Sequence, residues 1–551
     1  MKFIRKTFSL LLVFWACLFF SGRASAQDSN NNYGIVPRPK SITSQAGSSP
    51  FRINSETKII FNGKEAKQIA NYLSEKLAQA TGYGTRAEKG KRAKKNTIRL
   101  AVDNSGKGKA EAYRLESSAN GVSITGNSST GLFYGVQTLL QLLPPEIYSD
   151  KKQQAQWTVP AVKIEDEPFF EKIRGLHVDI SRHFRNKEEM FKTIDYVAYH
   201  KLNTLHIHLT DDQGWRIEIK AFPKLTEIGA IGDHSTPGKG KKQFYTQKEM
   251  REIIAYAKAR HIDIIPEIDM PGHMQATIRA YPELKSPTDK REPAKVIRID
   301  EKGEEFCKKV LDEINDLFTP EYIHIGFDEI NFGSKKKIYG NEEITAFAGK
   351  LAEYVKTDLK ATPIVWDDAF EKGWHDKQTL VHWWRYGKVH WWKDLPLTID
   401  QKVQKLDQPY LLSPANKTYF DMRNAKGEAG AGWAGIASID KLYVWEPLLD
   451  LTDADPSKNH LAQGVIACTW SEQIKTWDDF QDRTFPRLAA LSEKGWAQPK
   501  NIDLNKPNWK TWRDEVLIKK QLKRYQFMGI KYWSHNSPEK LLKLAPEKKA
   551  K

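Results

Sequence analysis

The chain has 551 residues, of which 40% are hydrophobic, 11% aromatic and 28% charged. This composition is typical of globular proteins and excludes a disordered chain and a membrane channel. The formal net charge of +17 comes from basic residues that are spread along the sequence. A solvated basic surface is therefore favoured over nucleic-acid binding, and an exported protein that meets anionic glycans is the alternative.

The N-terminus predicts export to the periplasm or the medium. Three basic residues within the first six positions precede an apolar run over residues 8–20, and Ala24-Ser25-Ala26 has the small residues of a cleavage site. Residues 1–26 are predicted to be a signal peptide, and losing its four basic residues lowers the net charge to +13. A surface lipoprotein is disfavoured because the apolar run continues past Cys17. No later run reaches the roughly 18 apolar residues of a membrane span, so we expect that the protein is not an integral membrane protein.

Residues 27–165 are predicted to form a small α+β domain without catalytic residues. Asn120-Gly121 is the preferred residue pair of a tight hairpin turn, so the segments on either side are expected to pair as strands. Pro144-Pro145 ends the helix that precedes it. The expected elements are a strand over 57–61, a helix over 69–80, a strand over 97–102, a hairpin over 111–125 and a helix over 132–143.

From residue 166 to residue 500, short apolar runs alternate with helical patterns. Capping boxes of Asn186 with Glu189 and of Thr246 with Glu249 mark the start of two helices. Eight strands alternating with helices predict a (β/α)₈ TIM barrel, and a doubly wound open sheet is the alternative. The predicted strands are Arg174–Ser181, Thr204–Thr210, Ile262–Ile268, Tyr322–Phe327, Thr362–Trp366, Thr379–Trp384, Pro409–Ser413 and Gly464–Trp470.

The last segment, residues 501–551, is Lys-rich and is predicted to be a helical segment packed on the outside of the barrel. Cys307 and Cys468 remain after removal of the signal peptide. Both lie in apolar segments, which favours buried free thiols over a disulfide or a nucleophile. The sequence has no zinc-type CxxC spacing and no glycine-rich phosphate loop, so no metal and no cofactor is predicted.

Acidic and aromatic side chains follow nearly every predicted strand. In a TIM barrel the carboxyl ends of the strands meet at one face, where the active site lies. Carboxyl groups can act on glycosidic oxygens and hydroxyl groups, while flat rings pack on sugar faces, so this ring of residues predicts a carbohydrate site. The alternative is that each residue only supports the barrel rim. The ring includes Asp179, Arg182, Asp211, Glu267, Asp269, His273, Asp328, Glu329, Trp366, Asp367, Asp368, Trp384, Tyr419, Asp421, Trp470 and Glu472.

Most of these residues fall into six ordered segments, and Trp366, Asp367, Asp368 and Trp384 lie between the fourth and the fifth. The six segments are Arg174–Phe184 (RGLHVDISRHF), His208–Arg216 (HLTDDQGWR), Pro266–His273 (PEIDMPGH), His324–Glu329 (HIGFDE), Tyr419–Asp421 (YFD) and Trp470–Glu472 (WSE). In this order they resemble the motifs of glycoside hydrolase family 20, the β-N-acetylhexosaminidases. The resemblance extends from about residue 33, including the family's small N-terminal domain, to Trp496. It implies an exo-acting enzyme that removes terminal β-linked N-acetylglucosamine or N-acetylgalactosamine from glycans, and it leaves open whether sulfated sugars are accepted.

The resemblance also implies a role for each matching residue. Glu329 would be the general acid/base, Asp328 would hold the substrate's acetamido N–H, and Tyr419 would donate to its carbonyl. The acetamido oxygen would attack the anomeric carbon, and water would open the resulting oxazolinium ion with retention. The other implied residues are Arg182, Asp421 and Glu472 at sugar hydroxyl groups, Trp366, Trp384, Trp470 and Trp433 as walls, and Asp211 and His273 as a network behind Glu329.

Simple structural interpretations stay open for several of these residues. Asp328-Glu329 would then be an acidic pair at a helix N-terminus, Arg182 a partner in a surface ion pair, and His273 a turn residue after Pro-Gly. Asp211 would only cap a loop. His177 and His206 are expected to be structural rather than functional.

Other functional classes make different demands on the sequence. A glycan-binding protein without activity would be expected to lack Asp328, Glu329 or Tyr419, and all three are present. The spaced DxxDxDxE motif of chitinases is absent, and no cluster of arginine and stacking residues indicates nucleic-acid binding. One residue departs from the family pattern. Phe327 stands where the family commonly has a small residue, so its ring is expected either to reshape the end of the fourth strand or to fill the barrel core.

Overall fold

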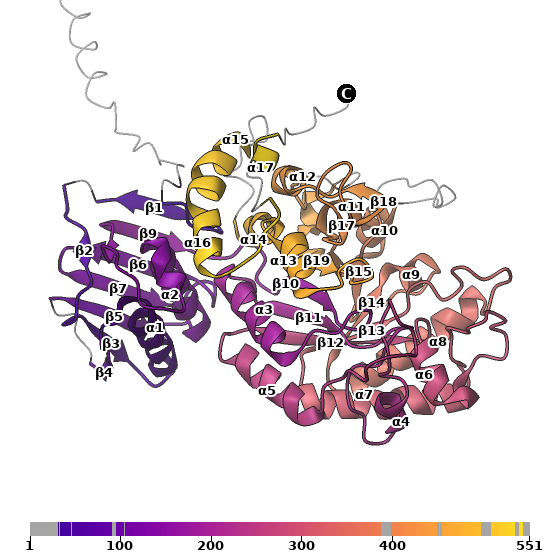
Figure 1. The fold of residues 1–551 in the computed structure, drawn as a ribbon. Helices are drawn as coiled ribbons and strands as arrows, with labels where there is room; N and C mark the ends of the chain where they lie inside the picture. Colours follow the sequence, from indigo (N-terminus) through magenta and orange to yellow (C-terminus); the bar gives the residue numbers. More distant parts are fainter. Residues whose placement is uncertain are drawn as a thin grey trace, which may run out of the picture.

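A computed structural model describes residues 31–543, except for 32, 46, 91–94, 104, 387–397, 449–450, 452–453, 498–508 and 535–538. The predicted signal peptide lies outside the described residues. None of the described helices has both the length and the apolar character that crossing a membrane requires. Figure 1 shows a sheet domain beside a barrel, with the last helices of the chain lying between them.

The N-terminal domain is a seven-stranded sheet covered by two long helices, α1 (Glu65–Thr81) and α2 (Ser129–Leu142). The predicted hairpin is present, because β6 and β7 pair antiparallel with Ser118 opposite Gly121. The sheet order is β1 (Ser41–Ser44), β9 (Val162–Asp166), β6 (Tyr113–Ser118), β7 (Gly121–Gly126), β5 (Thr97–Val102), β3 (Lys58–Asn62) and β4 (Ala87–Lys89).

The second domain is a closed barrel of eight strands, each parallel to its neighbours, which confirms the predicted TIM barrel and excludes the open sheet. The barrel closes where Ile173 of its first strand lies opposite Gly464 of its last. In barrel order the strands are β10 (Ile173–Asp179), β11 (Thr204–His208), β12 (Asp263–Met270), β13 (Tyr322–Gly326), β14 (Thr362–Trp366), β15 (Leu380–Trp383), β16 (Tyr410–Leu412) and β19 (Ala462–Thr469).

The barrel helices begin where local side chains satisfy their first N–H groups. Both predicted capping boxes are present, at the starts of α3 (Lys187–Tyr199) and α5 (Gln247–Lys258). Cys307 is a buried free thiol on α7, and Cys468 is another on β19. The other main barrel helices are α7 (Glu301–Phe318), α8 (Asn341–Thr357), α10 (Ile399–Leu406), α12 (Ile439–Val444), α13 (Trp477–Thr484) and α14 (Arg487–Trp496).

The C-terminal helices join the two domains. They comprise a π-helical segment over Trp512–Gln521, α16 (Leu522–Phe527) and the short α17 (Glu539–Lys543). The Tyr199 hydroxyl of barrel helix α3 donates to Gln521 at 2.7 Å, and Arg524 donates to the Gln141 carbonyl of α2 at 2.7 Å. The segment therefore packs on the N-terminal domain as well as on the outside of the barrel.

A buried ion pair also lies where the two domains meet. The Asp166 carboxylate accepts from the Lys201 ammonium at 2.9 Å and from the Trp496 indole N–H at 2.8 Å. The Tyr113 hydroxyl donates to the same carboxylate at 2.6 Å. Because every partner is buried, the carboxylate is matched by a cation and by hydrogen bonds, as a charge removed from water requires.

The closing contact of the barrel predicts the effect of a single methyl group. In Gly464→Ala the new Cβ would lie 1.8 Å from the Ile173 carbonyl oxygen, so β10 and β19 would have to separate. We expect a loss of about 1–3 kcal/mol in the free energy of unfolding, measured by denaturant titration. Gly84→Ala is the control, since its Cβ would meet nothing within 4 Å. If both substitutions lowered the free energy of unfolding by the same small amount, the close contact between β10 and β19 would be contradicted.

Candidate active site

A cavity of about 1010 Å³ lies where the carboxyl ends of the barrel strands meet. Every residue to which the family resemblance gave a role lines it, except Asp211. The structure therefore brings these residues together at one cavity. The other acids of the predicted ring, Asp179, Glu267, Asp269, Asp367 and Asp368, do not line it. The lining residues are Arg182, His273, Asp328, Glu329, Phe332, Trp366, Trp384, Tyr419, Asp421, Gly430, Ala431, Gly432, Trp433, Trp470, Glu472 and Gln473.

The acidic pair is presented by an unusual turn at the end of β13. Gly326, Phe327 and Glu329 all have left-handed backbone, with φ of +73°, +75° and +48°. At Gly326 a Cβ would lie 1.8 Å from Asp269 Oδ1, so only glycine fits there. The Phe327 ring is fully buried and lies 6.0 Å from the Phe347 ring of α8. The ring packs between β13 and α8 and does not line the cavity, so it fills the protein core.

The Glu329 carboxyl group keeps its proton to a higher pH than an ordinary glutamate does. Burial raises its pKa to about 7, with the like charge of Asp328 adding to the effect and His273 opposing it. The side chain remains 36% exposed, so it can still reach a bound substrate. Its backbone N–H donates to Asp368 at 3.3 Å, which fixes the position of the acid. A protonated carboxyl group in a pocket is able to deliver a proton to a leaving group.

Asp328 shares its surroundings with another carboxyl group, Asp269. Burial and the charge of Asp328 raise the pKa of Asp269 well above its usual range. Asp269 is therefore protonated and can donate a hydrogen bond to Asp328. Burial also raises the pKa of Asp328, while His273 and the hydrogen bond from Asp269 favour its ionised form. The pair thus places an acceptor, Asp328, beside the acid.

Asp211 and His273 form the network behind the acid. His273 Nδ1 lies 3.2 Å from Asp211 Oδ1, and its Nε2 lies 3.5 Å from Asp328 Oδ2 and 3.7 Å from Glu329 Oε2. Burial lowers the pKa of His273, but the charges of Asp211 and Asp328 outweigh this and raise it well above the usual range. A cationic imidazole therefore lies between the buried Asp211 and the two acids of the cavity.

Aromatic rings form the walls of the cavity. The Trp384 and Tyr419 rings stack with centroids 6.4 Å apart, and the Trp433 ring meets Trp384 edge-on at 5.7 Å. Trp366 and Trp470 lie 5.7 Å apart on the same cavity. Burial raises the pKa of Tyr419 well above its usual range, so its hydroxyl group remains a donor. These flat faces suit the apolar surfaces of a sugar ring.

Charged groups at another part of the cavity wall can bind hydroxyl groups. Arg182 Nη2 lies 3.8 Å from Glu472 Oε1 and 2.6 Å from Asp211 Oδ2. Asp421 is 4% exposed. Burial and the like charge of Glu472 raise the pKa of Asp421 well above its usual range. The three groups predicted to bind sugar hydroxyls, Arg182, Asp421 and Glu472, are thus brought to one cavity.

Some lining residues were not predicted from the sequence. Phe332 is 71% exposed on the loop after Glu329, Gly430 and Gln473 also lie on loops, and Ala431 and Gly432 begin the short strand β18 (Ala431–Ile436). No pattern in the sequence indicates them. Asp269 and Asp368 had a signal, since both follow strands, but their support of Asp328 and Glu329 depends on contacts between strands.

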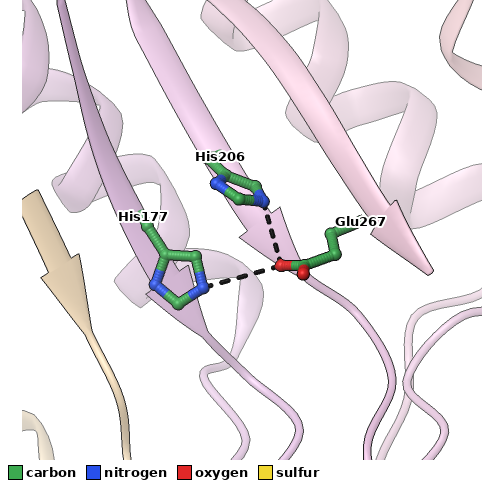
Figure 2. A group of neighbouring side chains, drawn as sticks. All are labelled: His177, His206 and Glu267. Carbon is green, nitrogen blue, oxygen red and sulfur yellow. Dashed lines mark ion pairs between the residues drawn. The ribbon is translucent and has the colours of Figure 1, made fainter. Parts of the chain in front are cut away.

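Several groups of side chains have the residue types of a metal site. One is His177, His206 and Glu267, which point toward one another from three neighbouring strands (Figure 2). His206 Nε2 lies 2.9 Å from Glu267 Oε2. Two ligands of a tetrahedral zinc ion with bonds near 2.0 Å are roughly 3.3 Å apart, so this shorter distance fits a direct contact between the two side chains better. That the protein needs no metal or cofactor stays a prediction.

Comparison with known proteins identifies the family. A family model described as "Glycosyl hydrolase family 20, catalytic domain" matches residues 172–499, and one described as "Glycosyl hydrolase family 20, domain 2" matches residues 32–167. The chain belongs to this family. The two matches correspond to the barrel and to the seven-stranded sheet domain.

The relatives of this family 20 chain are β-hexosaminidases. It is 32% identical to that of Porphyromonas gingivalis over 88% of this chain and 63% of the relative. It is also 32% identical to that of Vibrio furnissii over 70% of this chain and 65% of the relative. The chain thus spans just under two thirds of both. Among solved structures, the N-acetyl-β-hexosaminidase of Streptomyces plicatus in complex with Thio-NAglucal matches with a TM-score of 0.80 and 31% identity, covering 92% of this chain and 97% of that one.

The raised pKa of Glu329 predicts the pH dependence of any reaction in which it donates a proton. Its pKa of about 7 lies above the ordinary value, so the acid form predominates below pH 7 and is lost as the pH rises through 7. We expect kcat/KM on a β-N-acetylglucosaminide to fall tenfold per pH unit above about 7. Glu329→Gln is expected to lower kcat by roughly 10²–10⁴ and to abolish this alkaline limb. If the variant still lost activity above pH 7, the alkaline decrease would belong to another titrating group.

Proposed function

We propose that the protein is an exo-acting β-N-acetylhexosaminidase that removes terminal β-linked N-acetylglucosamine or N-acetylgalactosamine from glycans. The observation that supports this most is the grouping of Asp328, Glu329 and Tyr419 in one aromatic cavity, where the pKa of Glu329 is raised to about 7. A glycan-binding protein on this fold would have no need of a perturbed acid. Membership of family 20 and the β-hexosaminidase relatives support the same activity.

The reaction we propose is retaining and assisted by the substrate. Glu329 protonates the glycosidic oxygen, while the acetamido oxygen attacks the anomeric carbon and displaces the leaving group. Asp328 accepts the acetamido N–H and stabilises the oxazolinium ion, and Tyr419 donates to the acetamido oxygen to hold the attacking geometry. Glu329, now ionised, takes a proton from water, which adds to the anomeric carbon and returns the retained sugar.

The remaining residues of the cavity bind the sugar. Trp366, Trp384 and Trp470 enclose the acetamido group and the ring, which excludes water from the reacting atoms. Trp433 is 42% exposed, so its ring lies at the edge of the pocket. The hydroxyl groups are held by Arg182, Asp421 and Glu472, and the acid is supported by Asp211 and His273. We propose that the enzyme acts after export and cleavage behind Ala26, on the strength of the N-terminal sequence.

Substrate assistance predicts how changes in the acetyl group alter the rate. Successive fluorines on the acetyl methyl group withdraw electrons from the acetamido oxygen and weaken it as a nucleophile. We expect kcat on aryl N-acetylglucosaminides to fall progressively with one, two and three fluorines. A β-glucoside, which has no acetamido group, is expected to be essentially inert, and a thiazoline analogue of the intermediate is expected to bind far more tightly than the substrate.

Two outcomes would contradict this mechanism without removing the activity. One is a flat rate across the fluorinated series, and the other is a covalent sugar adduct on Asp328 or another carboxyl group, detected by mass spectrometry. Asp328→Asn provides the matched variant, because it keeps the size of the side chain and removes the charge. It should lower kcat more than it weakens the binding of the product sugar.

We propose further that anionic glycans, sulfated ones among them, are accepted. The loop that carries Phe332 into the cavity wall continues with three exposed lysines, Lys335, Lys336 and Lys337. Within the described part of the chain none of the three forms an ion pair, so their charge is available to a ligand at the pocket edge. Arg291 donates to the Phe332 carbonyl at 2.9 Å and anchors the loop.

Salt dependence tests the preference for anionic glycans. The ratio of kcat/KM on a sulfated and a plain N-acetylglucosaminide is expected to fall as salt is raised, because the screening length is about 8 Å at 0.15 M. Changing Lys335, Lys336 and Lys337 together to Ser is expected to lower the ratio at low salt and to leave the plain substrate unaffected. A ratio that does not change with salt would exclude this preference.

A further inference from the structure

Glu267 lies in the core of the barrel and has no role in the reaction proposed above. It is on β12 and is fully buried, as are the histidines around it. Figure 2 shows His177 of β10 and His206 of β11 directed at its carboxylate. Glu267 Oε2 lies 2.9 Å from His206 Nε2 and 3.7 Å from His177 Nε2. A carboxylate this deep inside a protein is costly unless it has a cation and hydrogen bonds.

Two contacts of Glu267 lead from the core to the cavity. Its Oε1 accepts a hydrogen bond from the Trp366 indole N–H at 2.8 Å, and Trp366 is a wall of the cavity. Its Oε2 lies 2.7 Å from Nδ1 of His208, at the end of β11. The opposite nitrogen of His208, Nε2, lies 2.9 Å from Asp211 Oδ2. Glu267 is thus connected both to the aromatic wall and to the partner of His273.

We propose that Glu267 is a positioning residue of the active site, which holds Trp366 directly and holds the acid Glu329 through His208, Asp211 and His273. The proposal rests on the function proposed above and extends it to a residue that touches neither substrate nor the cavity. It assigns one buried carboxylate to two tasks, the shape of the acetamido pocket and the orientation of the proton donor.

The charges along this route alternate. Burial raises the pKa of Glu267, but the neighbouring imidazoles, His208 first, outweigh it, and the pKa lies well below its usual range. Burial lowers the pKa of His208, but Glu267 and Asp211 outweigh it and raise the pKa to about 10. Along this route Glu267 is therefore negative, His208 positive, Asp211 negative and His273 positive. Each contact is a charge-assisted hydrogen bond or ion pair, which is stronger and more directional than a neutral one.

Three other buried imidazoles of the core, those of His177, His324 and His382, do not carry this charge. Burial lowers the pKa of His177 to about 3 and also lowers the pKa of His324 and His382. These rings are neutral at physiological pH, and His382 Nε2 lies 2.7 Å from the Ser413 hydroxyl. His208 is a cation that contacts both Glu267 and Asp211, so we expect loss of the Glu267 carboxylate to weaken the contact between His208 and Asp211.

The direct test is Glu267→Gln in the full-length enzyme. Gln keeps the size of the side chain but removes the charge that keeps His208 protonated. We expect kcat to fall about 10- to 100-fold on a natural disaccharide such as diacetylchitobiose, as misplacement of catalytic groups does. The loss is expected to be several-fold smaller on a dinitrophenyl glycoside, whose leaving group needs little protonation. This ratio of losses does not depend on how much of the variant folds.

Asp166→Asn is the matched control. Asp166 is also a buried carboxylate that accepts from a tryptophan N–H and from a cation, but it lies where the two domains meet. Its loss is expected to lower the unfolding temperature and to reduce kcat on the two substrates by the same factor. If Glu267→Gln also reduced kcat by the same factor on both substrates, Glu267 would be structural only and the proposal would be wrong.

His208→Asn tests the route itself. Asn can replace Nδ1 toward Glu267 but is too short to reach Asp211. We expect it to reproduce the substrate-dependent loss of Glu267→Gln, and the double variant to lose little more than the worse single variant, because coupled residues are not additive. If the fold-loss in kcat of the double variant equalled the product of the two single losses, the two residues would act independently and the proposed route would be wrong.

A measurement without substrate separates this inference from the proposed function. In ¹⁵N spectra of the histidine rings, His208, assigned with the Asn variant, is expected to stay cationic to about pH 9 and to titrate at lower pH in Glu267→Gln. A neutral His208 at pH 7 in the unaltered protein, or no change in the variant, would overturn the inference. Failure of the unaltered protein to hydrolyse any β-N-acetylhexosaminide would instead reject the proposed function.

Discussion

The buried carboxylate of Asp211 is the group on which the arrangement of the cavity depends. It forms ion pairs with Arg182 at 2.6 Å, His208 at 2.9 Å and His273 at 3.2 Å. These three residues lie at the ends of three neighbouring strands. Such a carboxylate is stable away from water only if all these partners are in place, because breaking one leaves uncompensated charge. The contact therefore fixes three strand ends against one another, and it places a cationic imidazole beside Asp328 and Glu329.

Much of the fold and of the site follows from patterns that depend on neighbours in the chain. The eight strands were predicted within a few residues of their bounds, because buried parallel strands are short apolar runs between amphipathic helices. The site followed from the same pattern, since a closed barrel brings residues after different strands to one face. Phe332, Gly430 and Gln473 were missed because they enter the cavity from loops, whose path is set by contacts such as that of Arg291 with the Phe332 carbonyl.

The protonation states and second contacts of the site could not be predicted in this way. Glu267 and Asp269 are two positions apart on β12, and both are acids near a strand end. In the structure one is ionised among imidazoles and the other is protonated beside Asp328. Their difference comes from residues on β10, β11 and β13, which are distant in the sequence. The sequence indicates that a carboxyl group is present, whereas its charge is decided by the strands on either side.

The turn after β13 shows how a strained backbone is kept at such a site. A left-handed conformation costs a residue with a side chain about 1–2 kcal/mol, and Phe327 adopts it with a φ of +75°. Full burial of a phenylalanine ring contributes about 1.5–3 kcal/mol, so the packing of Phe327 near Phe347 offsets the strain. Glu329 also has positive φ but remains partly exposed, so burial offers no such compensation. Its conformation is held instead by the hydrogen bond from its N–H to Asp368, which directs the acid into the cavity.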